Sequence, residues 1–126
     1  MKALHLTLKK KWFDMIASGE KKEEYREIKP YWASRLTWHE FHCCISCVES
    51  LKDVIQSDSE QRFTTGVFTT KYDTVTFKHG YAKDAPTITL KCNGITYGPA
   101  KPEWSDNWQG DVFIIKLGDI LNNHYK

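Results

Sequence analysis

Short runs of alternating apolar and polar residues constrain the fold of this chain more than any other feature. In residues 3–8 (ALHLTL) leucine stands at every second position, and a period of two returns in residues 74–78 and 87–92 and briefly in 95–97. Such alternation is typical of a β-strand with one buried face. Residues 112–117 form a near-continuous apolar run, which predicts one more strand. The pattern therefore favours a fold built mainly of short strands.

One segment has a helical period instead. Trp12, Met15 and Ile16 lie at helical spacing, and Gly19 stands where a left-handed residue would end a helix. These positions predict an amphipathic helix over residues 9–18, directly after the first strand.

The segment after this helix is polar, yet it alternates. If residues 20–28 are extended, Glu24 and Arg26 lie on the same face of a strand. Pro30 ends that strand and can begin a short helix or turn over residues 31–36.

The remaining segments separate or follow the strands. Turn-forming residues at 79–86 and at 92–94 predict breaks between strands, residues 98–110 predict a long ordered loop, and residues 118–123 a closing turn or helix. Residues 39–62 have no clear pattern: 39–48 suits a buried strand, and the polar 49–62 suits a loop or a short helix. The whole predicts an α+β fold, a small closed or half-closed β-barrel with the N-terminal helix packed against it.

Length and hydropathy limit the class of protein. The 126 residues suit one domain, residues 1–126, and 40% apolar with 27% charged residues is typical of a globular chain. The longest aliphatic and aromatic run is far shorter than the ~20 residues of a membrane span. Lysines 9–11 interrupt the N-terminal apolar stretch before a signal-peptide core forms. We therefore expect a cytoplasmic protein with no membrane partner.

The charge balance argues against a protein that coats nucleic acid. The net charge is only +2, although residues 1–35 hold nine Lys or Arg and five Asp or Glu. Any contact with nucleic acid is therefore expected to be local.

A cluster of charged residues follows the predicted helix. Residues 19–26 (GEKKEEYR) have the form G-x-K-x-x-E-x-R. Glu24 and Arg26 share a strand face, and Lys21 joins them if the chain bends at Gly19. Two cations beside one carboxylate suit a phosphate or a ring carbonyl, with Glu24 accepting from an exocyclic amine. The same spacing equally suits a structural salt-bridge network that holds the helix to the barrel.

This string, placed between a helix and a strand, resembles the signature of the ASCH domain, a small β-barrel of the PUA-like superfamily. The order of elements, ending in the strand at 113–118, is also similar to that family over most of the chain. The resemblance implies a cleft beside the barrel that holds RNA or a modified nucleotide or nucleoside without a cofactor. The residues that it implies for this cleft are Gly19, Lys21, Glu24 and Arg26.

The resemblance also leaves open the alternative that the protein is an enzyme. Some ASCH members look like amidohydrolases that remove acyl groups from nucleosides, and others like ribonucleases; here Lys21 and Glu24 would be the catalytic residues. In the amidohydrolase type a threonine nucleophile stands where this chain has Glu24. Its absence favours binding over that catalysis. A third alternative is a protein-interaction module in which the charged motif is structural.

Aromatic residues supply candidate stacking surfaces for bases. Trp32, after the motif, and Trp104, in the long loop, are the better candidates for the cleft, whereas the helix position of Trp12 favours the core. Residues 71–74 (KYDT) are a further candidate for the lining of the cleft.

The cysteines are clustered. Cys43, Cys44 and Cys47 include a C-x-x-C pair beside His39 and His42, which are residue types that bind zinc. A second pair at zinc-finger spacing is missing, so we expect free thiols and no metal site.

Overall fold

A curled sheet organises the fold in this computed structural model, which describes residues 2–36, 63–64, 67–68, 72–80, 83–106 and 110–123. The elements are β1 (Ala3–Leu8), α1 (Lys10–Ala17), β2 (Glu23–Arg26), α2 (Pro30–Leu36), β3 (Phe63–Thr64), β4 (Val67–Phe68), β5 (Thr74–His79), β6 (Thr87–Pro99), the 3-10 helix η1 (Pro102–Trp104) and β7 (Asp111–Asn123). β1 pairs with β5 in parallel, and antiparallel pairs continue the sheet through β6 and β7 to β2. The short strands β3 and β4 extend the sheet from β6.

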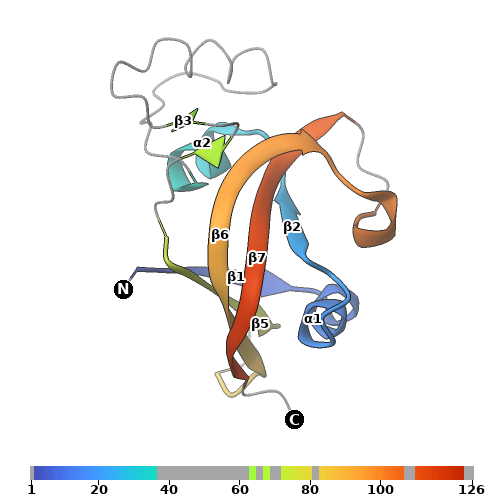
Figure 1. The fold of residues 1–126 in the computed structure, drawn as a ribbon. Helices are drawn as coiled ribbons and strands as arrows, with labels where there is room; N and C mark the ends of the chain where they lie inside the picture. The colour runs from blue at the N-terminus through green and yellow to red at the C-terminus, as the bar shows by residue number, and fades with distance from the viewer. Residues whose placement is uncertain are drawn as a thin grey trace.

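The long hairpin of β6 and β7 curls this sheet into a half-barrel (Figure 1). Each of the two strands has 13 residues, and register shifts between Thr89 and Gly94 bend them. The strands at the two ends of the curl are β1 and β2, and no described pairing joins them. The predicted α+β class with a half-closed barrel therefore agrees with the structure.

Two sequence predictions in this hairpin are wrong. The turn predicted at 92–94 is instead a bulge inside a continuous β6, with Gly94 at φ 125°. Turn chemistry and bulge chemistry use the same residues, because both need a positive φ. The closing turn or helix predicted at 118–123 is strand, since β7 continues to pair with β6 as far as Ile88 opposite Asn123.

The other predicted elements lie close to their expected positions. The helix predicted at 9–18 is α1, and the short helix after Pro30 is α2. The motif strand covers only Glu23–Arg26 of the predicted 20–28, and the loop at 98–110 contains the end of β6 and η1. The segment 39–62, which had no clear pattern, lies outside the described residues.

α1 is fixed to the half-barrel through its apolar face, beside the ends of β1 and β2 (Figure 1). Phe13 and Ile16 are buried in the main core, and the ring of Phe13 lies 6.0 Å from that of His79 on β5. Burial of such a side chain contributes about 1.5–3 kcal/mol. The helix is thereby packed against one side of the half-barrel. Among the described helices, none is long and apolar enough to cross a membrane.

The chain turns sharply where α1 ends. Gly19 has φ 86°, which places it in the left-handed region that other residues avoid. Its N–H donates to the carbonyl of Ile16, and the N–H of Lys21 donates back to the carbonyl of Met15. This turn is the bend that directs Lys21 toward the strand that follows.

Candidate functional site

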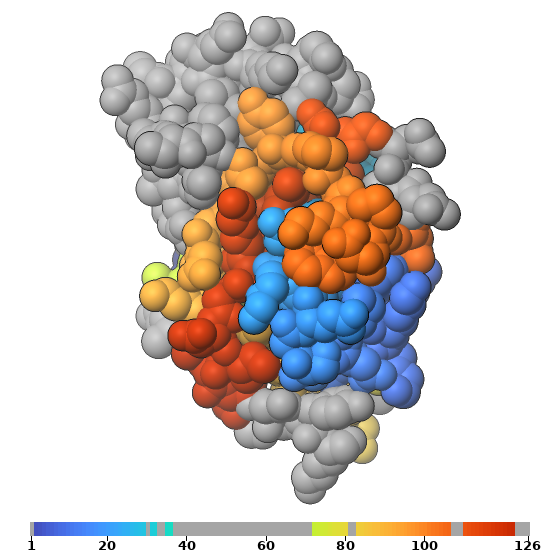
Figure 2. Space-filling model, turned by 45° about the vertical axis from the view of Figure 1, so that its right-hand side comes forward, coloured from blue at the N-terminus to red at the C-terminus, as the bar shows by residue number. Residues whose placement is uncertain are grey.

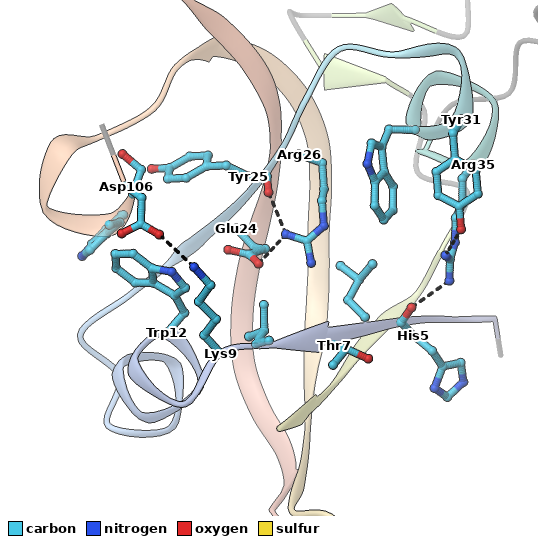
Figure 3. Close-up of a pocket in the computed structure, with 15 residues that line it drawn as sticks. His5, Thr7, Lys9, Trp12, Glu24, Tyr25, Arg26, Tyr31, Arg35 and Asp106 are labelled. Atoms are coloured by element: carbon cyan, nitrogen blue, oxygen red, sulfur yellow. Dashed lines mark hydrogen bonds and ion pairs between the residues drawn. The ribbon is translucent and has the colours of Figure 1, made fainter. Parts of the chain in front are cut away.

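An open cleft lies where the half-barrel does not close, between the edge strands β1 and β2 (Figure 3). Its volume is about 760 Å³, within the range of roughly 300–1,000 Å³ that is typical of small-ligand sites. The start of α1 and the residues after η1 form one end of the cleft, and α2 forms the other. The lining residues are His5, Leu6, Thr7, Leu8, Lys9, Trp12, Glu24, Tyr25, Arg26, Tyr31, Trp32, Arg35, Trp104, Ser105 and Asp106.

Glu24 is the centre of the charged motif. Its Oε1 accepts from Nζ of Lys21 at 2.7 Å, and its Oε2 accepts from Nη1 of Arg26 at 2.6 Å. The residue is only 4% exposed, and it lies on the β2 wall of the cleft. The structure thus brings the three motif residues together, and their combined formal charge is positive.

Lys21 lies behind Glu24. It is 1% exposed and lines not this cleft but a separate small pocket, together with Gly19. Its ammonium group lies 5.2 Å from the ring of Trp12 and 5.0 Å from the ring of Tyr25. Burial lowers the pKa of Lys21 from its ordinary value, although Glu24 offsets part of this effect. Lys21 therefore holds the carboxylate of Glu24 in place through a buried hydrogen bond and does not itself face the cleft.

Arg26 faces the cleft in a fixed orientation. Its Nη1 donates both to Glu24 and to the carbonyl oxygen of Tyr25, at 2.7 Å in the second case. The guanidinium carbon lies 5.2 Å from the ring of Trp32. Within the described part of the chain, Nε and Nη2 make no hydrogen bond, so these donors remain for a ligand.

The α2 side of the cleft holds a second arginine. Arg35 donates from Nη1 to the hydroxyl of Tyr31 at 2.8 Å and from Nη2 to the carbonyl of His5 at 2.7 Å (Figure 3). Its guanidinium carbon lies 5.6 Å from the ring of Trp32. Arg35 was not predicted as a cleft residue from the sequence. The available signal was its position four residues after Tyr31, which places both residues on one face of a helix.

The loop that follows β6 covers the other side of β2, where Figure 2 shows it in orange over the blue N-terminal segment. The hydroxyl of Tyr25 donates to Glu23 at 2.8 Å and accepts from the N–H of Lys101 at 3.2 Å. Burial raises the pKa of Tyr25, which keeps this phenol protonated. Trp104 packs against the small core cluster of Tyr25, Val112 and Ile114, and it also lines the cleft.

An exposed ion pair stands at the end of the cleft next to α1. Nζ of Lys9 lies 3.7 Å from Oδ2 of Asp106, and both side chains are exposed (Figure 3). Such pairs contribute little to stability. Trp12 is buried in the core, which confirms its predicted position. It also lines this end of the cleft, which the sequence did not predict.

Other candidates from the sequence lie elsewhere. Tyr72 donates to the carbonyl of Arg35 at 2.7 Å, Asp73 accepts from the N–H of Lys2 at 2.8 Å, and neither they nor Thr74 line the cleft. Lys71 lies outside the described residues.

The predicted cysteine and histidine cluster cannot be compared with the structure. Cys43, Cys44 and Cys47, with His39 and His42, lie outside the described residues. Cys92 is a buried free thiol whose pKa burial raises. In the part of the chain that is described, no three His, Cys, Asp or Glu residues are grouped to hold a metal ion.

Known proteins give no match to this chain: comparisons with protein-family models, with curated proteins and with solved structures all find none. The chemistry of the cleft is therefore the basis for a functional conclusion. Aromatic rings, two guanidinium groups and the carboxylate of Glu24 suit a ligand with a flat polar ring and negative charge, while the second carboxylate, of Asp106, pairs with Lys9.

Proposed function

We propose that this protein binds RNA or a modified nucleotide or nucleoside in the cleft between β1 and β2, as a member of the ASCH family with a PUA-like barrel. The observation that carries the proposal is the position of Glu24 and Arg26, side by side on one wall of a cleft that Trp32 and Trp104 also line. The G-x-K-x-x-E-x-R string, which resembles the ASCH signature, supports the family.

The motif offers a donor next to an acceptor. Nε and Nη2 of Arg26 can donate, and each carboxylate oxygen of Glu24 keeps a lone pair beyond the bond that it already accepts. A nucleobase edge carries the same two kinds of group, a carbonyl or ring nitrogen next to an exocyclic amine. Stacking on an aromatic ring adds about 1–3 kcal/mol per base.

Replacement of Arg26 by methionine tests the binding site. Wild-type protein is expected to bind 5′-mononucleotides or a single-stranded hexaribonucleotide, and Arg26→Met to bind them about 10- to 100-fold more weakly, because a charge-assisted contact is lost. Isothermal titration calorimetry measures both. Lys116→Met, at an exposed position outside the cleft lining, is the matched control and should bind as wild type does. Wild type that binds none of these probes, or Arg26→Met that binds them equally well, would contradict the proposal.

The position of Lys21 argues against a hydrolase in this cleft. A general base must reach its proton within hydrogen-bond distance or through one water. Lys21 is enclosed by Trp12, Tyr25 and Glu24, and it does not line the cleft. Glu24 also occupies the place where the amidohydrolase type has its threonine.

We accordingly expect no turnover of N4-acylated cytidine or of RNA above a control without protein, measured by chromatography of the products. Turnover that disappears in Lys21→Met and Glu24→Gln, with the fold intact, would establish the hydrolase instead. Glu24→Thr restores the missing hydroxyl, so deacylation that appears only in this variant would show that position 24 separates binding from catalysis.

A further inference from the structure

Two guanidinium groups lie over the same aromatic ring at the α2 end of the cleft. The guanidinium carbons of Arg26 and Arg35 lie 5.2 Å and 5.6 Å from the ring of Trp32. We propose that Arg26, Trp32 and Arg35 form a phosphate subsite, so that the ligand is a phosphorylated nucleotide or a phosphodiester and not a free nucleoside. The inference rests on the proposed function and adds the chemical class of the ligand.

Both guanidinium groups are held in place before any ligand binds. Arg26 donates to the carbonyl of Tyr25 on β2, and Arg35 donates to the carbonyl of His5 on β1. These carbonyls belong to the two edge strands that flank the cleft, so the arginines are fixed on opposite walls of the opening (Figure 3). A group that is already ordered loses little conformational entropy when it binds a ligand.

Among the residues that the structure describes, the charge of Arg35 has no acidic partner. Both of its hydrogen-bond acceptors, the hydroxyl of Tyr31 and the carbonyl of His5, are neutral. Within the described residues no carboxylate lies within ion-pair distance of Arg35. A cation held between neutral oxygens, next to an aromatic ring, favours an anion from solution.

The other charges of the cleft place the anion at this end. Lys9 and Asp106 neutralise each other at the end next to α1, and Glu24, on the wall between, repels an anionic oxygen unless Lys21 and Arg26 compensate it. The excess positive charge therefore lies around Trp32. A ligand with its base beside Glu24 and its phosphate beside Arg35 keeps the phosphate away from the Glu24 carboxylate and close to the positive charge. The ligand is therefore expected to bind in one orientation.

The free donors match a phosphate group. A guanidinium has five N–H donors, of which Arg35 uses one on each terminal nitrogen and Arg26 uses two on Nη1. Each arginine therefore retains donors of the kind that bind phosphate oxygens in pairs. Lysine, with a single rotating ammonium group, would not reproduce this geometry.

The test compares each of the four ribonucleosides with its 5′-monophosphate, and with a hexaribonucleotide that lacks terminal phosphates. With wild-type protein we expect at least one monophosphate, or the hexaribonucleotide, to bind 10-fold or more tightly than the matching nucleoside in calorimetry at low salt. The monophosphate identifies a terminal phosphate as the ligand group, whereas the hexaribonucleotide identifies a phosphodiester. The preference should decline as salt is raised.

Arg35→Met is expected to reduce this preference for the phosphorylated ligand to less than threefold, and Arg35→Lys to restore only part of it. Lys91→Met, which removes the same charge at an exposed position outside the cleft lining, should keep the full preference. Far-ultraviolet circular dichroism shows whether each variant folds; if Arg35→Met does not, Arg35→Lys provides the comparison. Equal affinity of wild type for nucleoside and nucleotide, or a preference that stays at the wild-type level in the Arg35 variants, overturns the phosphate subsite alone. If no probe binds to wild type, the proposed function fails with it.

Discussion

Replacement of Glu24 by glutamine is expected to lower the free energy of unfolding by about 3–5 kcal/mol at pH 7, because it leaves a buried charge without its partner. Lys21 is 1% exposed, and within the described residues its only hydrogen-bond acceptor is Oε1 of Glu24, at 2.7 Å. The amide keeps the shape of the carboxylate and loses its charge. Urea denaturation followed by tryptophan fluorescence measures the loss.

The dependence of this loss on pH identifies its cause. Burial already lowers the pKa of Lys21, and removal of Glu24 takes away the largest effect that raises it. Between the pKa of folded Lys21 and its unfolded value of about 10.5, the unfolded chain binds the extra proton, so stability rises with pH by up to about 1.4 kcal/mol per unit. Because this window is wider in Glu24→Gln than in wild type, the difference between them should narrow from pH 7 toward pH 10.

Two comparisons strengthen the test. Glu27→Gln removes an exposed carboxylate that pairs with Lys29 at 2.9 Å, and it should change stability by less than about 0.5 kcal/mol. The double variant Lys21→Met, Glu24→Gln removes the stranded charge and should recover a large part of the loss. A difference that stays constant with pH, or a double variant as unstable as Glu24→Gln, would show that Lys21 is not the source.

The local elements of this fold could be predicted from the sequence because their signals are local. The alternation in residues 3–8 is β1, and the helical spacing up to Gly19 is α1. The end of β7 could not be predicted in this way. Ile120 and Leu121 are exposed there, so their strand conformation depends on pairing with β6 and not on burial.

The bulged hairpin shows a second limit. A Cβ at Gly118 would lie 2.8 Å from Oδ1 of Asn93, so the side chain of Asn93 on β6 lies directly against Gly118 of β7. Asn93 with Gly94 is typical of a tight turn, and the sequence alone does not distinguish a turn from a bulge. Only the continuous pairing with β7 does so.

The same distinction between local and long-range contacts applies to the candidate site. Lys21, Glu24 and Arg26 could be brought together from their spacing because the bend and the strand lie within one short segment. The contact of Arg35 with His5 spans 30 residues and depends on where the fold places α2 relative to β1. The burial of Lys21 was likewise not predictable, since Trp12 and Tyr25 cover it from separate elements.

Replacement of Phe13 by alanine is expected to cost about 3–5 kcal/mol, because the side chain is 0% exposed and its removal leaves a cavity under α1. Met15 on the same helix is only partly buried, so Met15→Ala is the matched control and should cost roughly 1 kcal/mol. Urea denaturation at pH 7 compares the two. A loss for Phe13→Ala no larger than that for Met15→Ala would show that α1 is held by other contacts.

The effect of Phe13→Ala should extend to the cleft, because α1 carries Trp12 into its lining and leads through Gly19 to Lys21. We therefore expect folded Phe13→Ala, in which α1 is less firmly packed, to bind the wild-type ligand more weakly than Met15→Ala does. A ligand at 100 times its dissociation constant stabilises a folded protein by about 2.7 kcal/mol, whereas a weakened site gains less at the same concentration. The free energy of unfolding of both variants is therefore measured with and without ligand. If the ligand stabilises both variants equally, α1 contributes to the core and not to the cleft.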